Sequence, residues 1–547
     1  MTIDRREFVR RGALAGALAI NPMGHGLLRE DAADQPTAGG DTLANAAAPF
    51  ELEEATVAQL SEGLASGRYT ARSLAEAYLA RIDAMDRNGP KVNAVIETNP
   101  DALDIADAMD RERREKGARG PLHGIPVLIK DNIDTGDKMK TSAGSLALAD
   151  TPAPRDSFVA RRLREAGAVI IGKTNLSEWA NFRSTRSVSG WSGRGRQTHN
   201  PYVLDRNPCG SSSGTGAAVS ANFAAVGVGT ETDGSVVCPS AANGLVGIKP
   251  TVGLVSRAGI VPISHTQDTA GAMCRSVADA ATLLGALAGV DPDDAATAAA
   301  RGHLRGDYRG FLTTDGLKGA RIGVSRNYFG FSDRVDAIMN DAIAAMKDAG
   351  AVIVDPANFV TKGKFDDAEF DVLLYEFKAD LNAYLAKSSS KYRTLADLIA
   401  FNNAHRDDEM PYFGQEIFEQ AQKKGPLTDR AYRLALAKCR RMSRAEGIDA
   451  LVAKYRLDAF VTPTGGPAWT TDLLNGDHFT GGSSTPAAVA GYPSITVPAG
   501  YIHGLPVGIS FTGTAWSEPT LIRLAYAYEQ ATKVRRAPQF LPTADLS

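Results

Sequence analysis

The sequence predicts one compact α/β/α domain built on a central mixed β-sheet, and three observations carry this prediction. Short continuous apolar runs, typical of strands buried on both faces, alternate with amphipathic helical stretches. Polar residues stand where several of these runs end, at the position where α/β folds place their sites. The 547 residues are 44% hydrophobic and 22% charged, the composition of a globular protein with a sizeable core.

The N-terminus resembles a twin-arginine export signal followed by a leader of disordered composition. Arg5-Arg6 precedes a weakly apolar run, residues 12–20, which is too short to span a bilayer. Ala44-Asn45-Ala46 fits a small-x-small cleavage site, so residues 1–46 are assigned to the signal and leader and residues 47–547 to the catalytic domain. We expect a protein that is periplasmic or secreted, without stable membrane insertion.

Two helices are predicted at the start of the domain. Thr70 can cap an amphipathic helix that runs to Met85, and Asn88-Gly89-Pro90 ends it. A second, highly charged helix is expected over residues 101–116. Its predicted inner side carries Leu103, Ala106 and Met109.

Two buried strands follow, each ending on polar residues. The apolar run of residues 124–129 leads to Lys130-Asp131-Asn132. A helix over residues 158–165 leads to a strand over residues 168–171, which continues into Lys173-Thr174-Asn175. This alternation places both polar groups at the carboxyl ends of strands.

Residues 294–458 show a different sequence pattern from the rest of the domain. They are predicted to be a helical cap insertion that shapes the substrate cleft. Helical patterns, such as those of residues 335–347 and 430–444, alternate with loops, and no catalytic signature stands out. Four aromatic residues are candidates for lining the cleft, although such residues more often belong to a core: Tyr375, Phe377, Phe413 and Phe418.

The C-terminal part is expected to return to the same sheet. Residues 493–497 and 508–511 read as strands, and residues 518–532 as a helix. The prediction is therefore one catalytic domain without a separate binding module.

Charge, cysteine and histidine usage argue against several classes of partner. A net charge of −3 gives no sign of the excess positive charge that is typical of nucleic-acid-binding proteins. The four cysteines and eight histidines form no metal-ligand spacing, so neither a metal nor a cofactor is expected. Cys209 and Cys238 could lie close together; buried free thiols are the favoured interpretation, with a disulfide as the alternative.

Three motif matches carry little weight. Residues 167–174 fit the P-loop pattern, but the four variable positions are apolar and β-prone, which favours a strand. Residues 388–391 match S-x-x-K without its companion motifs. Ser212 fits the nucleophile-elbow pattern G-x-S-x-G, which would require a histidine partner. None of the candidate histidines lies in a recognisable signature: His265, His405, His478 and His503.

The strongest chemical signal is a Gly/Ser-rich stretch over residues 208–249. Its glycine and hydroxyl positions crowd into two clusters, residues 210–216 and 230–235, separated by an Ala/Val run that reads as a buried connection. Glycines allow backbone N–H groups to approach a ligand, and a serine between them can remain free of packing neighbours. We therefore expect chemistry in the two clusters.

These clusters and several flanking segments resemble the signature of the amidase signature family. The similarity extends from about residue 50 to residue 535. Within the family it is strongest toward bacterial peptide amidases, through residues 175–182, 231–235 and 373–377. The segments that carry the family resemblance are residues 124–132, 172–175, 209–214, 229–235, 247–251, 490–498 and 504–508.

The resemblance implies the amidase signature fold and a Ser-cisSer-Lys triad. Ser235 matches the nucleophile, Ser211 the bridging serine with a cis peptide bond, and Lys130 the base. The two serines are 235 − 211 = 24 positions apart, as the resemblance implies for this pair. The implied oxyanion hole is formed by the backbone N–H groups of Thr232, Asp233, Gly234 and Ser235.

The chemistry is consistent with these residue types. A serine hydroxyl is a weak nucleophile until a base takes its proton, and a lysine can act as that base only when it is neutral. Burial lowers the pKa of an amine toward the working range. Asp233 stands where many relatives have a glycine, and its charge would favour an uncharged terminal amide over a free carboxylate near the reacting centre.

The implied reaction is hydrolysis of a carboxamide to a carboxylate and ammonia through an acyl-enzyme, with C-terminal peptide amides as the expected substrates. The alternatives are other small or fatty acid amides, an ammonia-donating amidotransferase subunit, and a binding protein on a decayed amidase scaffold. The export signal argues against the amidotransferase role. The expected partner is a small-molecule or peptide amide, with no obligate protein partner.

Overall fold

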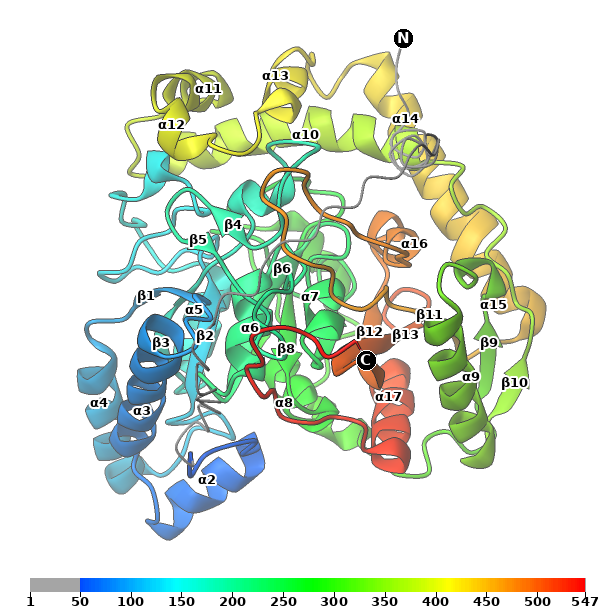
Figure 1. Ribbon diagram of the computed structural model, residues 1–547, viewed down its shortest axis with the longest axis horizontal. Helices are drawn as coiled ribbons and strands as arrows, with labels where there is room; N and C mark the ends of the chain where they lie inside the picture. Colours follow the sequence, from blue (N-terminus) through cyan, green and yellow to red (C-terminus); the bar gives the residue numbers. More distant parts are fainter. Residues whose placement is uncertain (1–49, 547) are drawn as a thin grey trace, which may run out of the picture. The chain divides into compact units, whose positions relative to one another are not determined.

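A mixed sheet of eleven strands forms the centre of the fold within residues 50–546, the part of the chain that the computed structural model describes (Figure 1). The predicted signal and leader, residues 1–46, lie outside the described residues. The strands, in order across the sheet, are β1 (Val95–Thr98), β3 (Val169–Thr174), β2 (Pro126–Lys130), β6 (Val226–Glu231), β8 (Thr269–Cys274), β7 (Val246–Lys249), β12 (Ser494–Ile502), β13 (Leu505–Thr512), β11 (Ala459–Pro463), β9 (Arg321–Val324) and β10 (Val352–Val354). A separate small ribbon pairs β4 (Trp191–Ser192) with β5 (Arg196–Gln197).

The direction of the strands brings Lys130 to the same edge of the sheet as the second Gly/Ser cluster. β2 pairs in parallel with β3 and β6, the strands from β6 to β11 pair antiparallel, and β9 and β10 extend the other end in parallel. Edge strand β1 is antiparallel to β3. Because β2 and β6 are parallel neighbours, their last residues, Lys130 and Glu231, lie at the same edge of the sheet.

Helices cover the sheet. The helices that precede the sheet strands or alternate with them along the chain are α2 (Val57–Ser66), α3 (Ala71–Arg81), α4 (Ala102–Lys116), α5 (Phe158–Glu165), α6 (Ser213–Ser220), α7 (Val237–Ala242), α8 (Val277–Leu287), α9 (Asp333–Asp348), α16 (Thr485–Ala490) and α17 (Glu518–Thr532). The helices that follow one another between β10 and β11 are α10 (Asp366–Lys387), α11 (Leu395–Ala404), α12 (Arg406–Glu409), α13 (Glu416–Gln422), α14 (Arg430–Arg440) and α15 (Asp449–Tyr455).

Glycines in the central strands let α6 and α7 approach the sheet closely. A Cβ on Gly227 would lie 2.7 Å from the side chains of Thr215 and Val219 on α6. A Cβ on Gly508 would lie 2.8 Å from Ala241 on α7. These two helices follow the two Gly/Ser clusters directly, so their depth against the sheet fixes where the clusters sit.

The first predicted helix is confirmed, and a partner that the sequence does not reveal holds it in place. Thr70 caps α3 through reciprocal hydrogen bonds with Ser73, and a π-helical turn, Ile82–Asn88, continues it to Gly89. The buried carboxylate of Asp110, on α4, accepts from the first backbone N–H groups of α3. On α4 itself Ala106 is buried, whereas Leu103 and Met109 are only half-buried.

The segment over residues 294–458 differs from the expected helical insertion. Its first part contributes β9, α9 and β10, which extend the sheet, and only the part from α10 onward is a layer of helices (Figure 1). β9 and β10 are only four and three residues long, too short to stand out as strands in the sequence. The four candidate aromatic residues of this segment are all buried: Tyr375, Phe377, Phe413 and Phe418.

The C-terminal prediction is confirmed. β12 and β13 enter the middle of the sheet between β7 and β11, and α17 has the predicted bounds. The fold is the expected single α/β domain with a large central mixed sheet. No helix in the described residues is both long and apolar enough to cross a membrane.

Candidate active site

Lys130 lies at the carboxyl end of β2 with its amine fully buried. Its Nζ lies 2.8 Å from Ser211 Oγ, 2.9 Å from Thr230 Oγ1 and 3.3 Å from the Thr230 carbonyl oxygen. Asn132 donates to the same Thr230 hydroxyl at 3.0 Å. The two oxygens of Thr230 can take the two N–H groups of a neutral amine, which leaves the lone pair of the nitrogen for the Ser211 hydroxyl.

Burial favours the neutral form of this amine. It lowers the pKa of Lys130 to about 7, while the negative charges of Asp268 and Glu231 act in the opposite direction. Lys173, on the neighbouring strand β3, is equally buried but serves a different purpose. Its Nζ donates to two backbone carbonyls and to Thr141. That arrangement satisfies all three N–H groups of an ammonium, and neither Ser211 nor Ser235 is among its partners.

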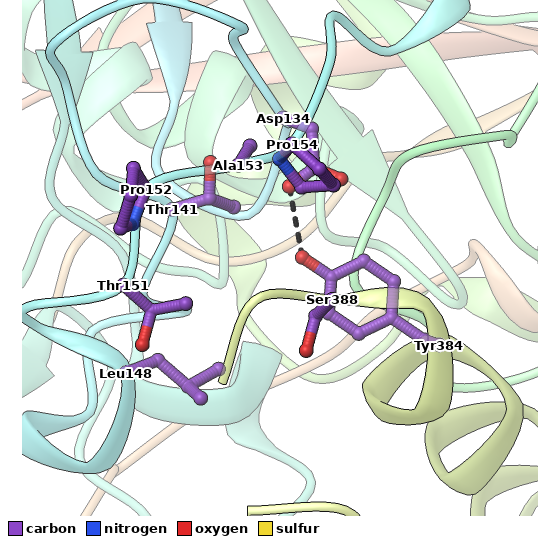
Figure 2. Close-up of a pocket in the computed structure, with 9 residues that line it drawn as sticks. All are labelled: Asp134, Thr141, Leu148, Thr151, Pro152, Ala153, Pro154, Tyr384 and Ser388. Atoms are coloured by element: carbon purple, nitrogen blue, oxygen red, sulfur yellow. Dashed lines mark hydrogen bonds between the residues drawn. The ribbon is translucent and has the colours of Figure 1, made fainter. Parts of the chain in front are cut away.

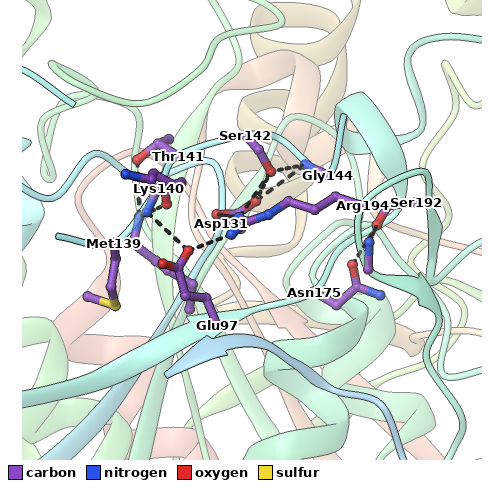
Figure 3. A network of polar contacts seen from close by, with 12 residues as sticks. Glu97, Asp131, Met139, Lys140, Thr141, Ser142, Gly144, Asn175, Ser192 and Arg194 are labelled. Carbon is purple, nitrogen blue, oxygen red and sulfur yellow. Dashed lines mark hydrogen bonds and ion pairs between the residues drawn. The ribbon is translucent and has the colours of Figure 1, made fainter. Parts of the chain in front are cut away.

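The turn after Lys130 is held by an ion-pair network (Figure 3). The buried carboxylate of Asp131 accepts from the Ser142 hydroxyl and from Arg194 Nη1, the latter at 3.3 Å. Arg194 Nη2 donates to Glu97 at 2.5 Å, which links the turn to edge strand β1. Removal of Arg194 would leave the buried Asp131 carboxylate without the cation that it directly contacts, so this network holds the turn just beyond the Lys130 amine.

Ser211 begins the turn into α6, and its neighbour Ser212 is a structural clamp. The peptide bond between Gly210 and Ser211 is cis, as the family resemblance implies. The Ser212 hydroxyl accepts from the Thr230 backbone N–H at 3.1 Å and donates to the Thr230 carbonyl at 3.0 Å. Both roles of that hydroxyl are therefore used to fasten the first Gly/Ser cluster to β6.

The histidines proposed as partners for Ser212 are all bound elsewhere. The closest contacts are to Asp380 for His265, to the Phe401 carbonyl for His405, to Asp472 for His478 and to Arg334 for His503. His265, Glu376 and Asp380 form a cluster that could hold a metal by composition. Tyr432, Ser264 and Thr266 already donate to Glu376, and the backbone N–H and Nδ1 of His265 contact Asp380, so these donors are engaged within the protein.

Ser235 lies in the loop between β6 and α7 and retains 8% exposure. Its hydroxyl makes no hydrogen bond within the described residues, including to Ser211. The two serine segments are joined through the backbone, because Ser212 N–H donates to the Ser235 carbonyl at 3.1 Å. The backbone N–H groups of residues 232–235 also donate to nothing in the described part of the chain, so they are available to a bound oxyanion.

Two carboxylates shape this loop. Glu231 accepts from the backbone N–H groups of Val236 and Val237 at 2.7 and 3.0 Å, which bends the chain back toward the end of β6. Asp233 accepts from the hydroxyls of Ser484 and Thr485, at the start of α16, at 2.5 and 2.7 Å. The loop that carries Ser235 is therefore tied both to its own strand and to the C-terminal half of the domain.

Sequence reasoning missed Thr230, Asn132 and Glu231 as members of this site. All three lie inside the segments that resemble the family signature, within two positions of a predicted site residue. Their side chains hydrogen-bond to Lys130, to each other or to the loop that carries Ser235. Only the parallel pairing of β2 with β6 shows that they come together. Strand direction is not readable from a single sequence, so no local signal identified them.

A small pocket lies beyond the site, where the loop after β2 meets the end of α10 (Figure 2). Tyr384 on α10 donates to Asp134 Oδ1 at 2.8 Å. Burial raises the pKa of Asp134 to about 6, against the hydrogen bond from Tyr384 and the charge of Lys173. This contact fastens the helical layer to the loop that follows the Lys130 strand.

Cys209 and Cys238 form a disulfide, so the favoured expectation of buried free thiols is wrong for this pair. Cys209 comes two residues before Ser211 and Cys238 three residues after Ser235. The backbone pairing of the two serine segments brings the sulfurs together, which spacing along the chain does not reveal. Cys274 and Cys439 are free and buried.

Loss of this disulfide is expected to lower stability. The cysteines are 29 residues apart, and a closed loop of that length is worth about 3–4 kcal/mol in the chain-entropy treatment. Cys209→Ala/Cys238→Ala should therefore unfold at lower temperature and lower urea concentration than the wild type. Cys274→Ala/Cys439→Ala is the control for loss of two buried sulfurs, and equal stability of the two double variants would contradict the expectation.

Comparison with known proteins shows which family the chain belongs to. Residues 73–522 match the family model described as amidase. A probable amidase of Arabidopsis thaliana is 45% identical over 502 residues, covering 90% of this chain and 93% of that protein. One subunit of the glutamyl-tRNA(Gln) amidotransferase of Moorella thermoacetica is 34% identical over 505 residues, covering 90% of this chain and 99% of that protein.

Solved structures give the same result. The X-ray structure of native peptide amidase from Stenotrophomonas maltophilia matches with a TM-score of 0.86 and 53% identity, covering 90% of this chain and all of that one. Similarity of sequence and of fold therefore extends over nearly the whole described domain. The chain belongs to the amidase signature family and is a serine amidohydrolase.

Proposed function

We propose that the chain hydrolyses the C-terminal amide of peptides, with Ser235 as nucleophile, Ser211 as proton relay and Lys130 as base. The observation that carries the proposal is the buried Lys130 amine, 2.8 Å from the Ser211 hydroxyl at the edge of the sheet where the Ser235 loop begins. Similarity to a peptide amidase at 53% identity supports the choice of substrate.

The proposed reaction begins with transfer of a proton from Ser235 to Ser211 and from Ser211 to Lys130. Ser235 Oγ attacks the amide carbon, and the negative charge on the carbonyl oxygen is stabilised by N–H groups of residues 232–235. The tetrahedral intermediate collapses when the proton returns through Ser211 to the leaving nitrogen, which departs as ammonia. Water then attacks the ester on Ser235 and releases the peptide carboxylate.

The Ser211–Ser235 step requires the two hydroxyls to meet once substrate is bound. Catalytic hydrogen bonds are often long in the absence of substrate and tighten in the complex, so an unpaired Ser235 hydroxyl is compatible with the proposal. The oxyanion donors each contribute roughly 3–4 kcal/mol in comparable sites.

The Asp233 carboxylate supports an uncharged substrate end. Both of its oxygens accept hydroxyl hydrogen bonds from the start of α16, which fixes a negative charge beside the proposed oxyanion donors. A carboxamide avoids the repulsion that a free carboxylate would meet there. Preference for acidic groups next to the scissile amide would contradict this part of the proposal.

Ammonia release by the purified chain tests the function. We expect release from a peptide with an amidated C-terminus, without any added protein and without loss of rate in the presence of a chelator. Parallel assays with short aliphatic amides and fatty acid amides distinguish the alternative substrates. A wild-type chain that is inert alone, and that releases ammonia only with partner subunits, would instead favour the amidotransferase role.

We also propose that the chain is exported through the twin-arginine route to the periplasm or medium. The proposal rests on the N-terminal arginine pair and apolar run, and the Cys209–Cys238 disulfide supports it because such bonds persist in oxidising compartments. Arg5→Lys/Arg6→Lys should keep the protein inside expressing bacteria. Unchanged export of this variant would contradict the proposal.

A further inference from the structure

We refer to residues 232–235, whose backbone N–H groups are the proposed oxyanion donors, as the oxyanion loop. Two consecutive residues, Gln267 and Asp268, hold this loop from one side. The Thr232 hydroxyl donates to Asp268 Oδ1 at 2.6 Å. Gln267 Nε2 donates to the Thr232 carbonyl at 3.3 Å. Thr232 is therefore held by hydrogen bonds to its side chain and to its carbonyl oxygen. Its backbone N–H has no partner in the described residues and is available to a bound substrate.

Asp268 is itself firmly placed. Its second oxygen accepts from the backbone N–H groups of Ile263 and Ser264 at 2.8 and 2.9 Å. Ser264 in turn donates to Glu376 of α10 at 2.5 Å, and Gln267 donates to Glu369 of the same helix at 3.1 Å. The loop over residues 263–268 therefore connects the helical layer to the loop that carries Ser235.

The same carboxylate acts on the base. Asp268 and Glu231 are the two negative charges that oppose the effect of burial on the pKa of Lys130. Burial raises the pKa of Asp268 itself to about 6, against its hydrogen bonds and the charge of Arg257, so it is largely ionised at neutral pH. Its negative charge favours the protonated form of Lys130, which is the form that cannot accept a proton from Ser211.

We propose that Asp268 is a positioning residue of the proposed amidase site, which holds the oxyanion loop through Thr232 and places a negative charge that acts on the Lys130 amine. The inference rests on the proposed function. It assigns two separable effects to one side chain. Removal of the Thr232 contact should slow the chemical step, whereas removal of the charge should extend activity to lower pH.

Two variants separate these effects, with the amidated peptide as probe and ammonia release as readout. Thr232→Val breaks the contact and keeps the Asp268 carboxylate, but loss of this hydrogen bond raises the pKa of Asp268. We expect kcat to fall roughly tenfold or more, up to the roughly 10²–10³-fold of a removed oxyanion donor, and the acid limb of kcat/KM to move less than in Asp268→Asn. Asp268→Asn removes the charge and leaves one oxygen instead of two to accept from Thr232 and from the backbone N–H groups of Ile263 and Ser264, so kcat should fall and the acid limb should move to lower pH.

Asp86→Asn is the matched control. Asp86 is buried, its pKa is also raised to about 6 by burial, and it accepts from two backbone N–H groups, those of Ala94 and Val95. It does not contact Thr232, so its variant should keep the wild-type acid limb even where stability falls. His265→Asn removes the imidazole of this loop, whose pKa is raised, against the effect of burial, by the hydrogen bond to Asp380 and the charge of Glu376, and it should also keep the limb.

The charged groups packed around the 263–268 loop determine how these results are read. His265 contacts Asp380, Arg257 contacts Asp294, and Glu369 and Glu376 face the loop from α10. An acid limb that disappears in His265→Asn would assign the limb to that histidine and overturn the inference. An Asp268→Asn limb equal to that of Asp86→Asn would overturn it as well.

Failure of the inference is distinguishable from failure of the proposed function. If the wild type releases no ammonia, or if Lys130→Ala keeps its rate, the proposed mechanism fails. If the wild type is active and Lys130→Ala is not, but Thr232→Val and Asp268→Asn both keep the wild-type kcat and acid limb, only the role of Asp268 fails.

Discussion

Ser235→Ala is expected to abolish amide hydrolysis, with a loss in kcat of about 10⁶-fold, the size seen when a serine nucleophile is removed from a comparable triad. The substitution deletes the proposed nucleophilic oxygen, while the backbone N–H groups of residues 232–235 remain. Binding of the amidated peptide should therefore survive. Initial rates of ammonia release, together with the affinity of the inactive variant for the peptide, check both parts.

Ser240→Ala is the matched control for this substitution. Ser240 lies on α7, five residues beyond Ser235, and its buried hydroxyl has no hydrogen-bond partner in the described residues. Loss of that hydroxyl should leave the rate close to the wild-type value. Near-normal activity of Ser235→Ala would exclude it as the nucleophile.

Ser212→Ala tests the nucleophile-elbow alternative. This variant leaves the N–H and carbonyl groups of Thr230 without their clamp, so a loss of about 1–3 kcal/mol in the free energy of unfolding is expected. Hydrolysis should persist in the folded fraction. Complete loss of activity in a folded Ser212→Ala protein would revive the elbow interpretation.

Lys130→Ala is expected to be nearly as damaging as loss of the nucleophile, because it removes the proposed base of both serines. Lys130→Arg should fail too, since a guanidinium stays protonated and cannot accept a proton. Ammonia release by both variants is measured against the wild type. Activity of Lys130→Arg close to that of the wild type would contradict the assignment of Lys130 as base.

The same residue predicts the pH dependence of the wild type. The pKa of Lys130 is lowered to about 7, so the amine is neutral above that pH and protonated below it. The value of kcat/KM should therefore fall as pH decreases through about 7, approaching tenfold for each further pH unit. A profile that stays flat from pH 8 down to pH 5 would show that no group with this pKa controls the rate.

The sequence predicted the parts of the fold and site that depend on local signals. The strand ending at Lys130 and the glycine frames around Ser211 and Ser235 are contiguous patterns, and the family resemblance orders them. The α/β fold and membership of the amidase signature family are confirmed. The catalytic roles of the three residues stay predictions, which the experiments above are designed to test.

What the sequence could not supply depends on contacts between distant segments. Thr230 joins the site because β6 lies parallel to β2, and the Cys209–Cys238 disulfide forms because two loops pair through their backbones. Asp268 reaches Thr232 from 36 positions away. The short strands β9 and β10 were hidden inside a segment dominated by helical patterns, because three or four residues give too little periodicity to detect.

The position of β12 and β13 has a consequence for the order in which the protein can fold. This C-terminal hairpin lies between β7 and β11, so β9, β10 and β11 join the rest of the sheet only through it. Lys130, Ser211 and Ser235 all leave the ribosome long before residues 494–512 do. The central sheet therefore cannot be completed until residues 494–512 have been synthesised, because no other strand joins the two groups of strands on either side of them.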